Sequence, residues 1–342
     1  MTDLRLLSLP AGLALENGAT LAPVQIAYKT FGTLNAARDN VVWVCHALTA
    51  NADVLSWWAG LFGSGDYFDP ADWFIVCANI VGSCYGSTGP LTAADNQAPL
   101  YHQFPLVTIR DMVAAHEALR QELELTKIHT LIGGSLGGQQ ALEWAILRPE
   151  VFVHLVVLAT NALHSPWGIA FNEAQRLAIF ADATYHQGTP TGGQQGLKAA
   201  RATALLSYRS YDAYGRTQAE ADPDRLDDFR ASSYQQHQGD KLVARFNAYS
   251  YVALSRTMDT HNVGRGRASA AEALAGIRAR TLVLSISSDV LFPPVEQQFL
   301  ARHIPGATYA EMDSQFGHDG FLIETAQITQ LLERFYVSTF VH

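Results

Sequence analysis

The segment HTLIGGSLGGQQALEW (129–144) places a serine between closely spaced glycines, where an apolar strand-like run gives way to a helix-like one. A turn this tight holds the serine backbone in a sparsely populated conformation, and neighbouring side chains would collide with the adjoining strand or helix. Gly133 and Gly137, two residues before and after Ser135, remove those side chains. The pattern predicts that the Ser135 hydroxyl stands exposed at a helix N-terminus, where backbone N–H groups stabilise a developing oxyanion.

A glycine-rich turn can also match this spacing by chance, so the fold prediction depends on the surrounding pattern. Short apolar runs typical of buried parallel strands occupy residues 41–46, 73–80, 129–134, 152–159 and 281–286. A helix-like stretch, 108–125, lies between two of these runs, with Thr108 as its N-cap and Asp111 three residues on. The alternation predicts an α/β fold with a mostly parallel central sheet flanked by helices. Residues 22–32 alternate in polarity and predict an antiparallel edge hairpin.

The strand pattern stops near Asn161 and resumes only after Gly276. The intervening residues are helical in pattern and rich in polar and aromatic side chains. Because the chain must return to complete the sheet, this segment reads as an insertion. We predict a core domain built from residues 1–160 and 277–342, with a helical lid over residues 161–276.

The composition excludes several classes of function. The formal net charge is −9 and no sustained basic stripe occurs, which argues against a nucleic-acid partner. No run approaches the roughly 20 apolar residues of a membrane span, and the N-terminal residues lack a leader pattern. The expectation is a cytoplasmic protein with no membrane partner. Its cysteines, Cys45, Cys77 and Cys84, form no CxxC pair and predict reduced structural thiols and no metal site.

A serine hydroxyl needs a general base, and the base needs a carboxylate that fixes its tautomer. In sheets of this kind these partners follow the serine in the order acid, then histidine, each just after a later strand. Asp289 follows the run 281–286, and His318 follows a short strand-like run, 308–312. Asp289 could instead cap the following helix. Among later histidines, His303 and the terminal His342 compete with His318, but neither follows a strand.

An oxyanion hole requires two N–H donors. The first is predicted at Leu136, directly after the serine. The second is predicted in the loop HALTAN (46–51) that follows an early strand, at Leu48, with Thr49 as the alternative. His46 is expected to shape this loop.

Taken together, these residues resemble the homoserine O-acetyltransferase family. The resemblance rests on the motifs CHALTANADV, NIVGSCYGSTGP, GGSLGGQQALEWA, SDVLFPPVEQ and FGHDGFLIE. It extends through the lid in HSPWGIAFNEAQRLAI (164–179), in parts of GLKAARATALLSYRS (196–210) and in RFNAYSYVALSRTMDTHNVGRGR (245–267). It therefore covers nearly the whole chain, and the lid motifs are more specific than the serine turn.

The resemblance implies an α/β-hydrolase fold and ping-pong transfer of an acetyl group from acetyl-CoA, through Ser135, to the L-homoserine hydroxyl in methionine biosynthesis. It implies acetyl-CoA as cosubstrate, no permanently bound cofactor, and homoserine held by Arg201 and Asp319. Arginine suits a carboxylate and aspartate suits an ammonium group. Ala50 and Gly320 depart from the family pattern beside the expected substrate pockets.

A homodimer through the lid is a further implication. The aromatic run 246–254 could form either its contact surface or the core of the lid.

Other functions stay open from the sequence. The same catalytic residues serve an esterase-type hydrolase, and similar transferases use succinyl-CoA as donor or L-serine as acceptor. A catalytically inactive binding protein is a further alternative. Arg265 and Arg267 form the densest positive pair of this acidic chain, so we predict that they attract the CoA phosphates. The alternative for this pair is a solvated lid turn.

Overall fold

The computed structural model describes residues 3–93 and 98–337. The strands of the main sheet are β1 (Arg5–Leu9), β4 (Val24–Phe31), β5 (Val41–Cys45), β6 (Phe74–Ala78), β7 (Ile128–Gly134), β8 (Phe152–Leu158), β9 (Arg280–Ile286) and β10 (Thr308–Met312). A small hairpin, β2 (Leu13–Ala14) with β3 (Thr20–Leu21), lies outside this sheet. The apolar runs of the sequence therefore become β5 to β9, as predicted.

The eight strands found in the described residues are ordered β1-β4-β6-β5-β7-β8-β9-β10. β4 pairs antiparallel with both β1 and β6, and every pair from β6 to β10 is parallel. The predicted antiparallel segment, 22–32, thus contains β4, but β4 lies one strand inside the sheet, and the edge strand is β1. Because parallel strands end at one edge of a sheet, the loops after β5, β7, β9 and β10 meet there.

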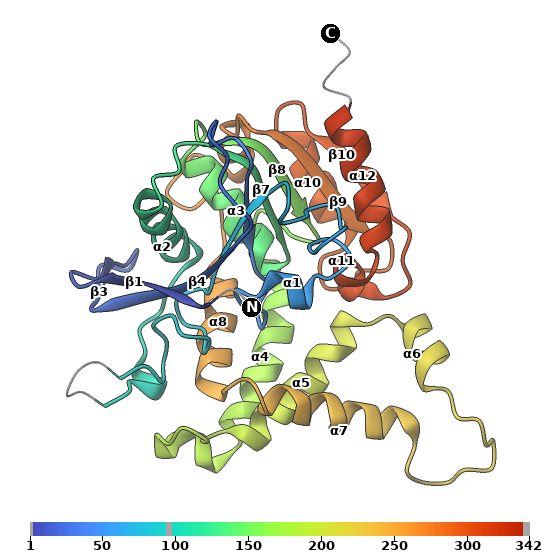
Figure 1. Cartoon of the computed structure of the whole chain (residues 1–342). Helices are drawn as coiled ribbons and strands as arrows, with labels where there is room; N and C mark the ends of the chain where they lie inside the picture. The colour runs from blue at the N-terminus through green and yellow to red at the C-terminus, as the bar shows by residue number, and fades with distance from the viewer. Residues whose placement is uncertain (1–2, 94–97, 338–342) are drawn as a thin grey trace.

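Side chains alternate between two hydrophobic layers, one on each face of the sheet. In β5, Trp43 and Cys45 pack into one layer and Val42 and Val44 into the other, and all are fully buried. The helices of the core are α1 (Val54–Trp57), α2 (Ile109–Glu122), α3 (Leu136–Leu147), α9 (Ala270–Ala275), α10 (Pro294–His303), α11 (Gly320–Ile323) and α12 (Thr325–Val337). α2, α3 and α10 cover the first layer, and α1 and α12 cover the second (Figure 1).

The predicted cap of α2 is present. The Thr108 hydroxyl accepts the Asp111 N–H, and the Asp111 carboxylate accepts the Thr108 N–H at 2.8 Å. This reciprocal pair satisfies two of the donors that a helix N-terminus leaves free.

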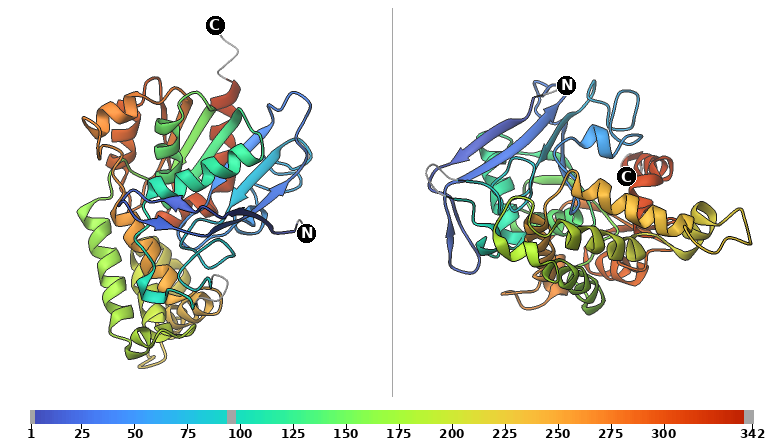
Figure 2. Two further views of the ribbon diagram at one scale, coloured as in Figure 1. Left: turned by 90° about the vertical axis from the view of Figure 1, so that its left-hand side faces the viewer. Right: turned by 90° about the horizontal axis from the view of Figure 1, so that it is seen from below.

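The insertion consists of α4 (Pro166–Phe180), α5 (Gln194–Tyr208), α6 (Tyr211–Gln218), α7 (Arg230–Val243) and α8 (Ala248–Asp259). These helices gather at one end of the sheet (Figures 1 and 2). Tyr249, Tyr251 and Leu254 of α8 are buried, so the aromatic run lies in the core of the lid. That buried core is continuous with the first layer beside the sheet.

The lid closes earlier than the predicted end at residue 276. Leu163 and Asn262 form an antiparallel bridge, and the Val263 N–H donates to the Ala162 carbonyl at 2.9 Å. Beyond this neck, α9 packs against α3 and α10 of the core. Within the described residues, no helix is long and apolar enough to cross a membrane.

Candidate active site

Ser135 occupies the sharp turn between β7 and α3. Its backbone has φ 57° and ψ −127°, a strained conformation for a residue with a side chain. A Cβ on Gly133 would lie 2.4 Å from the Gly137 carbonyl oxygen, and a Cβ on Gly137 would lie 2.0 Å from that of Cys45. Both glycines are therefore required by space, as the sequence predicts.

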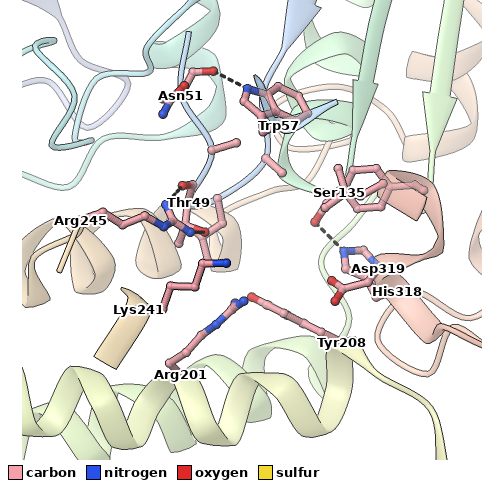
Figure 3. Close-up of a pocket in the computed structure, with 15 residues that line it drawn as sticks. Thr49, Asn51, Trp57, Ser135, Arg201, Tyr208, Lys241, Arg245, His318 and Asp319 are labelled. Carbon is pink, nitrogen blue, oxygen red and sulfur yellow. Dashed lines mark hydrogen bonds between the residues drawn. The ribbon is translucent and has the colours of Figure 1, made fainter. Parts of the chain in front are cut away.

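Hydrogen bonds join the three predicted catalytic side chains, and Figure 3 shows the one between Ser135 and His318. His318 Nε2 lies 2.9 Å from Ser135 Oγ, and His318 Nδ1 lies 2.7 Å from Asp289 Oδ2. All three side chains are buried. Ser135 follows β7, Asp289 follows β9 and His318 follows β10, so the common edge of the sheet brings them together.

Backbone bonds fix the Asp289 carboxylate. Its Oδ1 accepts the N–H groups of Leu291 at 2.8 Å and Phe292 at 2.9 Å, which leaves Oδ2 for His318. The N-cap of α10 is Pro293, so Asp289 does not cap that helix.

Aromatic rings hold the His318 imidazole. The Phe292 ring is stacked on it with centroids 5.1 Å apart, and the Phe321 ring meets it edge-on at 5.4 Å. Of the competing histidines, His303 lies on α10 with its Nδ1 beside the Phe299 carbonyl, and His342 lies outside the described residues.

The predicted oxyanion-hole donors lie beside Ser135. Leu136 is the first residue of α3, and Leu48 lines the same cavity as Ser135. Throughout 3–93 and 98–337, neither of their N–H groups has a protein acceptor. Both remain able to bind an oxyanion.

His46 has the predicted shaping role. The Ile80 N–H donates to its Nε2 at 3.2 Å, so Nδ1 carries the ring proton and donates to the Ala47 carbonyl at 2.8 Å. Burial lowers the pKa of His46 to about 4, which keeps the ring neutral. It therefore holds the loop that carries Leu48.

A cavity of about 370 Å³ opens onto Ser135 and His318. Its wall includes both predicted substrate residues, Arg201 from α5 and Asp319. Asp319 Oδ2 forms an ion pair with Arg209 Nε at 2.8 Å. One carboxylate oxygen of Asp319 therefore already has a partner within the protein.

The two departures from the family pattern lie in different surroundings. Ala50 lines the cavity. Gly320 instead faces Ser314 and Ile286, and a Cβ there would lie 3.0 Å from Ser314 Oγ. Elsewhere, the described residues hold no group of three or more His, Cys, Asp or Glu side chains arranged for a metal ion.

Arg265 and Arg267 do not reach this cavity, and the predicted role for them is not supported by their placement. Arg265 pairs with Glu16 at 2.8 Å, and Arg267 pairs with the buried Glu143 at 2.6 Å. Arg110 bridges both carboxylates. Both arginines are thus held in ion pairs within the fold, which their closeness in the sequence does not reveal.

The cavity has further lining residues to which the sequence alone assigns no role. The Arg201 guanidinium lies 5.4 Å from the centre of the Tyr208 ring, and that ring lies 5.8 Å from the His318 ring. Lys241 and Arg245 line the side formed by α7 and the turn after it. Tyr208 lies inside the SYRS motif, which supports the family resemblance but does not indicate what Tyr208 does. Lys241 lies in none of the motifs, so nothing in the local sequence points to it.

Comparison with known proteins places these observations in a family. Residues 40–325 match the model of the α/β-hydrolase fold family. The homoserine O-acetyltransferase of Cyclobacterium marinum is 47% identical over 326 residues, covering 95% of this chain and 93% of that protein.

Solved structures extend the comparison. The homoserine O-acetyltransferase structure from Bacillus anthracis has a TM-score of 0.90 at 21% identity, covering 98% of this chain and 97% of that one. The esterase E22 structure has a TM-score of 0.88 at 21% identity, covering 98% of this chain and 100% of that one. At this identity both structures show the fold alone, which transferases and esterases share.

Proposed function

The chain belongs to the homoserine O-acetyltransferase family of α/β hydrolases, and from this premise we propose that it transfers acetyl from acetyl-CoA to the hydroxyl of L-homoserine. The observation that carries the proposal is the Ser135–His318–Asp289 relay, which opens into one cavity with Arg201 and Asp319. That cavity offers a nucleophile beside one cationic and one anionic group, as an amino-acid acceptor requires.

In the first half-reaction, Ser135 Oγ attacks the thioester carbonyl of acetyl-CoA while its proton passes to His318 Nε2. The N–H groups of Leu48 and Leu136 stabilise the oxyanion of the tetrahedral intermediate. The carbon–sulfur bond then breaks, and the leaving thiolate takes the proton from His318. Free CoA departs and acetyl-Ser135 remains.

In the second half-reaction, the homoserine hydroxyl gives its proton to His318 and attacks acetyl-Ser135. Collapse of the intermediate returns that proton to Ser135 Oγ and releases O-acetylhomoserine. Arg201 binds the amino-acid carboxylate, and the Asp319 carboxylate binds the ammonium group. The Arg209–Asp319 ion pair supports this arrangement because it fixes the carboxylate next to the base.

Hydrolysis is the competing outcome, because water can also attack acetyl-Ser135. The lid favours transfer: its helices α5 and α7 supply Arg201 and Lys241 to the cavity wall and cover the site from one side. The sequence relatives that match nearly the whole chain are named as transferases. We infer that the lid holds homoserine where water would otherwise react.

The test is the release of CoA from acetyl-CoA, followed with a thiol reagent, with and without L-homoserine. Steady release is expected only with homoserine, and mass spectrometry should find O-acetylhomoserine. Ser135→Ala should abolish both. Equal release without homoserine would instead identify a hydrolase, and a preference for succinyl-CoA or L-serine in mixed reactions would identify a different transferase.

We also propose that the protein acts in methionine biosynthesis, in the cytoplasm, as a homodimer through the lid. Free cysteines fit a reducing compartment. Leu177 and Leu206 on the lid are more than half exposed and suit an apolar contact. Sedimentation over a range of concentrations tests the dimer, which a single species of monomer mass would exclude.

A further inference from the structure

Two cationic side chains line the part of the cavity that lies away from the catalytic relay. Lys241 comes from the last turn of α7, and Arg245 lies two residues beyond the helix end. Figure 3 shows both side chains across the cavity from Ser135 and His318. Neither takes part in the chemistry described above.

Both side chains are exposed, and neither charge has a carboxylate partner among residues 3–93 and 98–337. Lys198 on α5 provides the contrast, because its ammonium group pairs with Asp240 of α7 at 2.7 Å. The chain carries a formal net charge of −9. Two unneutralised cations beside one cavity of an acidic protein create a local positive potential that attracts an anion.

Arg245 is oriented by neutral acceptors. Its Nη1 donates to the Thr49 carbonyl at 2.5 Å and to the Tyr85 hydroxyl at 2.6 Å, and its Nη2 donates to Thr49 Oγ1 at 3.3 Å. A guanidinium group has five N–H donors, so two remain. The Arg245 guanidinium group is therefore held in place and keeps two N–H donors for a ligand. Lys241 adds a compact positive charge on a flexible side chain.

The charges of the cavity divide into two sets. Arg201 lies over the Tyr208 ring, which is next to His318, and Asp319 directly follows His318; this opposite-charge pair suits a zwitterionic amino acid. Asp319 is the one acidic side chain among the described residues of the cavity wall, and Figure 3 shows it beside His318, across the cavity from Lys241 and Arg245. These two cations therefore suit a ligand that carries several negative charges and no positive one. CoA is such a ligand, and its phosphates are separated from the reacting sulfur by the pantetheine arm.

We propose that Lys241 and Arg245 bind the phosphate groups of CoA at the mouth of the cavity, with the thioester end at Ser135. This assignment rests on the proposed function for the identity of the anion. It takes the place of Arg265 and Arg267, which do not line the cavity and are held in ion pairs elsewhere. Because Arg245 also holds Thr49, the bound phosphates lie against the loop that carries the Leu48 N–H.

The test compares the binding of CoA with that of pantetheine, which has the same thiol arm without phosphates, by titration calorimetry. Lys241→Ala should weaken CoA about fivefold relative to pantetheine, and Lys241→Glu about thirtyfold. Lys241→Arg should restore the wild-type ratio. The matched control, Lys198→Ala, removes a lid lysine that is already paired and should keep that ratio.

Added salt should weaken CoA binding to the wild-type protein more than to Lys241→Glu. Arg245→Gln should lower the preference for CoA over pantetheine about tenfold, because it removes a positive charge that binds phosphate. Any disturbance of the Thr49 loop would affect both ligands alike and would leave that preference unchanged. The assignment is overturned if the Lys241 and Arg245 variants change both affinities by the same factor, or change neither. These titrations use no homoserine and measure binding without any reaction. A negative result would therefore overturn the CoA-phosphate site without bearing on whether the protein transfers acetyl groups.

Discussion

Replacing Asp289 by asparagine should stop His318 from acting as the general base while keeping a side chain of the same size at position 289. Asp289 Oδ1 accepts two backbone N–H groups, from Leu291 and Phe292, and Oδ2 faces His318 Nδ1. In Asp289→Asn, the amide oxygen keeps the two backbone bonds, which turns the NH₂ group toward His318. An NH₂ group can only donate, so Nδ1 becomes an acceptor and the ring proton moves to Nε2. Protonated Nε2 cannot accept the Ser135 hydroxyl proton.

The size of the expected fall in kcat follows from the energy needed to flip the side-chain amide of the Asp289→Asn variant. Flipping it restores the productive tautomer, but it removes two hydrogen bonds of 2.8 and 2.9 Å. Each buried donor left without a partner costs about 1–3 kcal/mol, so the productive state is disfavoured by about 2–6 kcal/mol. We therefore expect kcat to fall about 30-fold to about 10⁴-fold.

Rapid-mixing measurements of CoA release test this prediction. Both acetylation and deacetylation should slow, because His318 serves each half-reaction, while the melting temperature stays near that of the wild type. Asp313→Asn is a suitable control, since that exposed carboxylate accepts only a long 3.4 Å contact from Ser287 nearby. A kcat for Asp289→Asn within about tenfold of the wild type would refute the tautomer argument.

Three further changes test other parts of the structure. Arg201→Lys loses the planar fork and should raise the homoserine KM about tenfold, more than the acetyl-CoA KM; equal increases would contradict its proposed role. Burial raises the pKa of Glu296 from 4.5 to about 7, so the folded state holds a proton that the unfolded chain releases, and stability falls as pH rises between those values. Glu296→Gln should thus be more stable than the wild type in urea by about 1 kcal/mol at pH 8 and similar to it at pH 5; an identical difference at both would disprove this. Gly137→Ala puts a Cβ 2.0 Å from the Cys45 carbonyl oxygen and should cost about 3 kcal/mol in thermal unfolding, whereas Gly215→Ala, with open space, should not destabilise.

The central strands could be predicted from the sequence because burial on both faces makes them continuous apolar runs. The runs 41–46 and 152–159 each differ by one residue from the strands that they predict, β5 and β8. The sequence does not predict β1 (Arg5–Leu9), because all five of its residues are exposed or only partly buried and form no continuous apolar run. The end of the lid was misplaced for a related reason: α9 is helical like the lid, and only its packing on α3 and α10 assigns it to the core.

The residues of the site also fall into those that local sequence predicts and those that it misses. Ser135, Asp289 and His318 each lie in the turn or loop that follows a strand, so strand order brings them to one edge of the sheet, and local sequence is sufficient. Arg265 and Lys241 show where that reasoning stops. A cation is available to a ligand only when the fold leaves it unpaired, and pairing depends on residues far away in sequence, as with Glu16 and Arg265, 249 positions apart. Charge density along the chain therefore selects the wrong arginines, whereas the balance of charge around the cavity selects a lysine with no motif of its own.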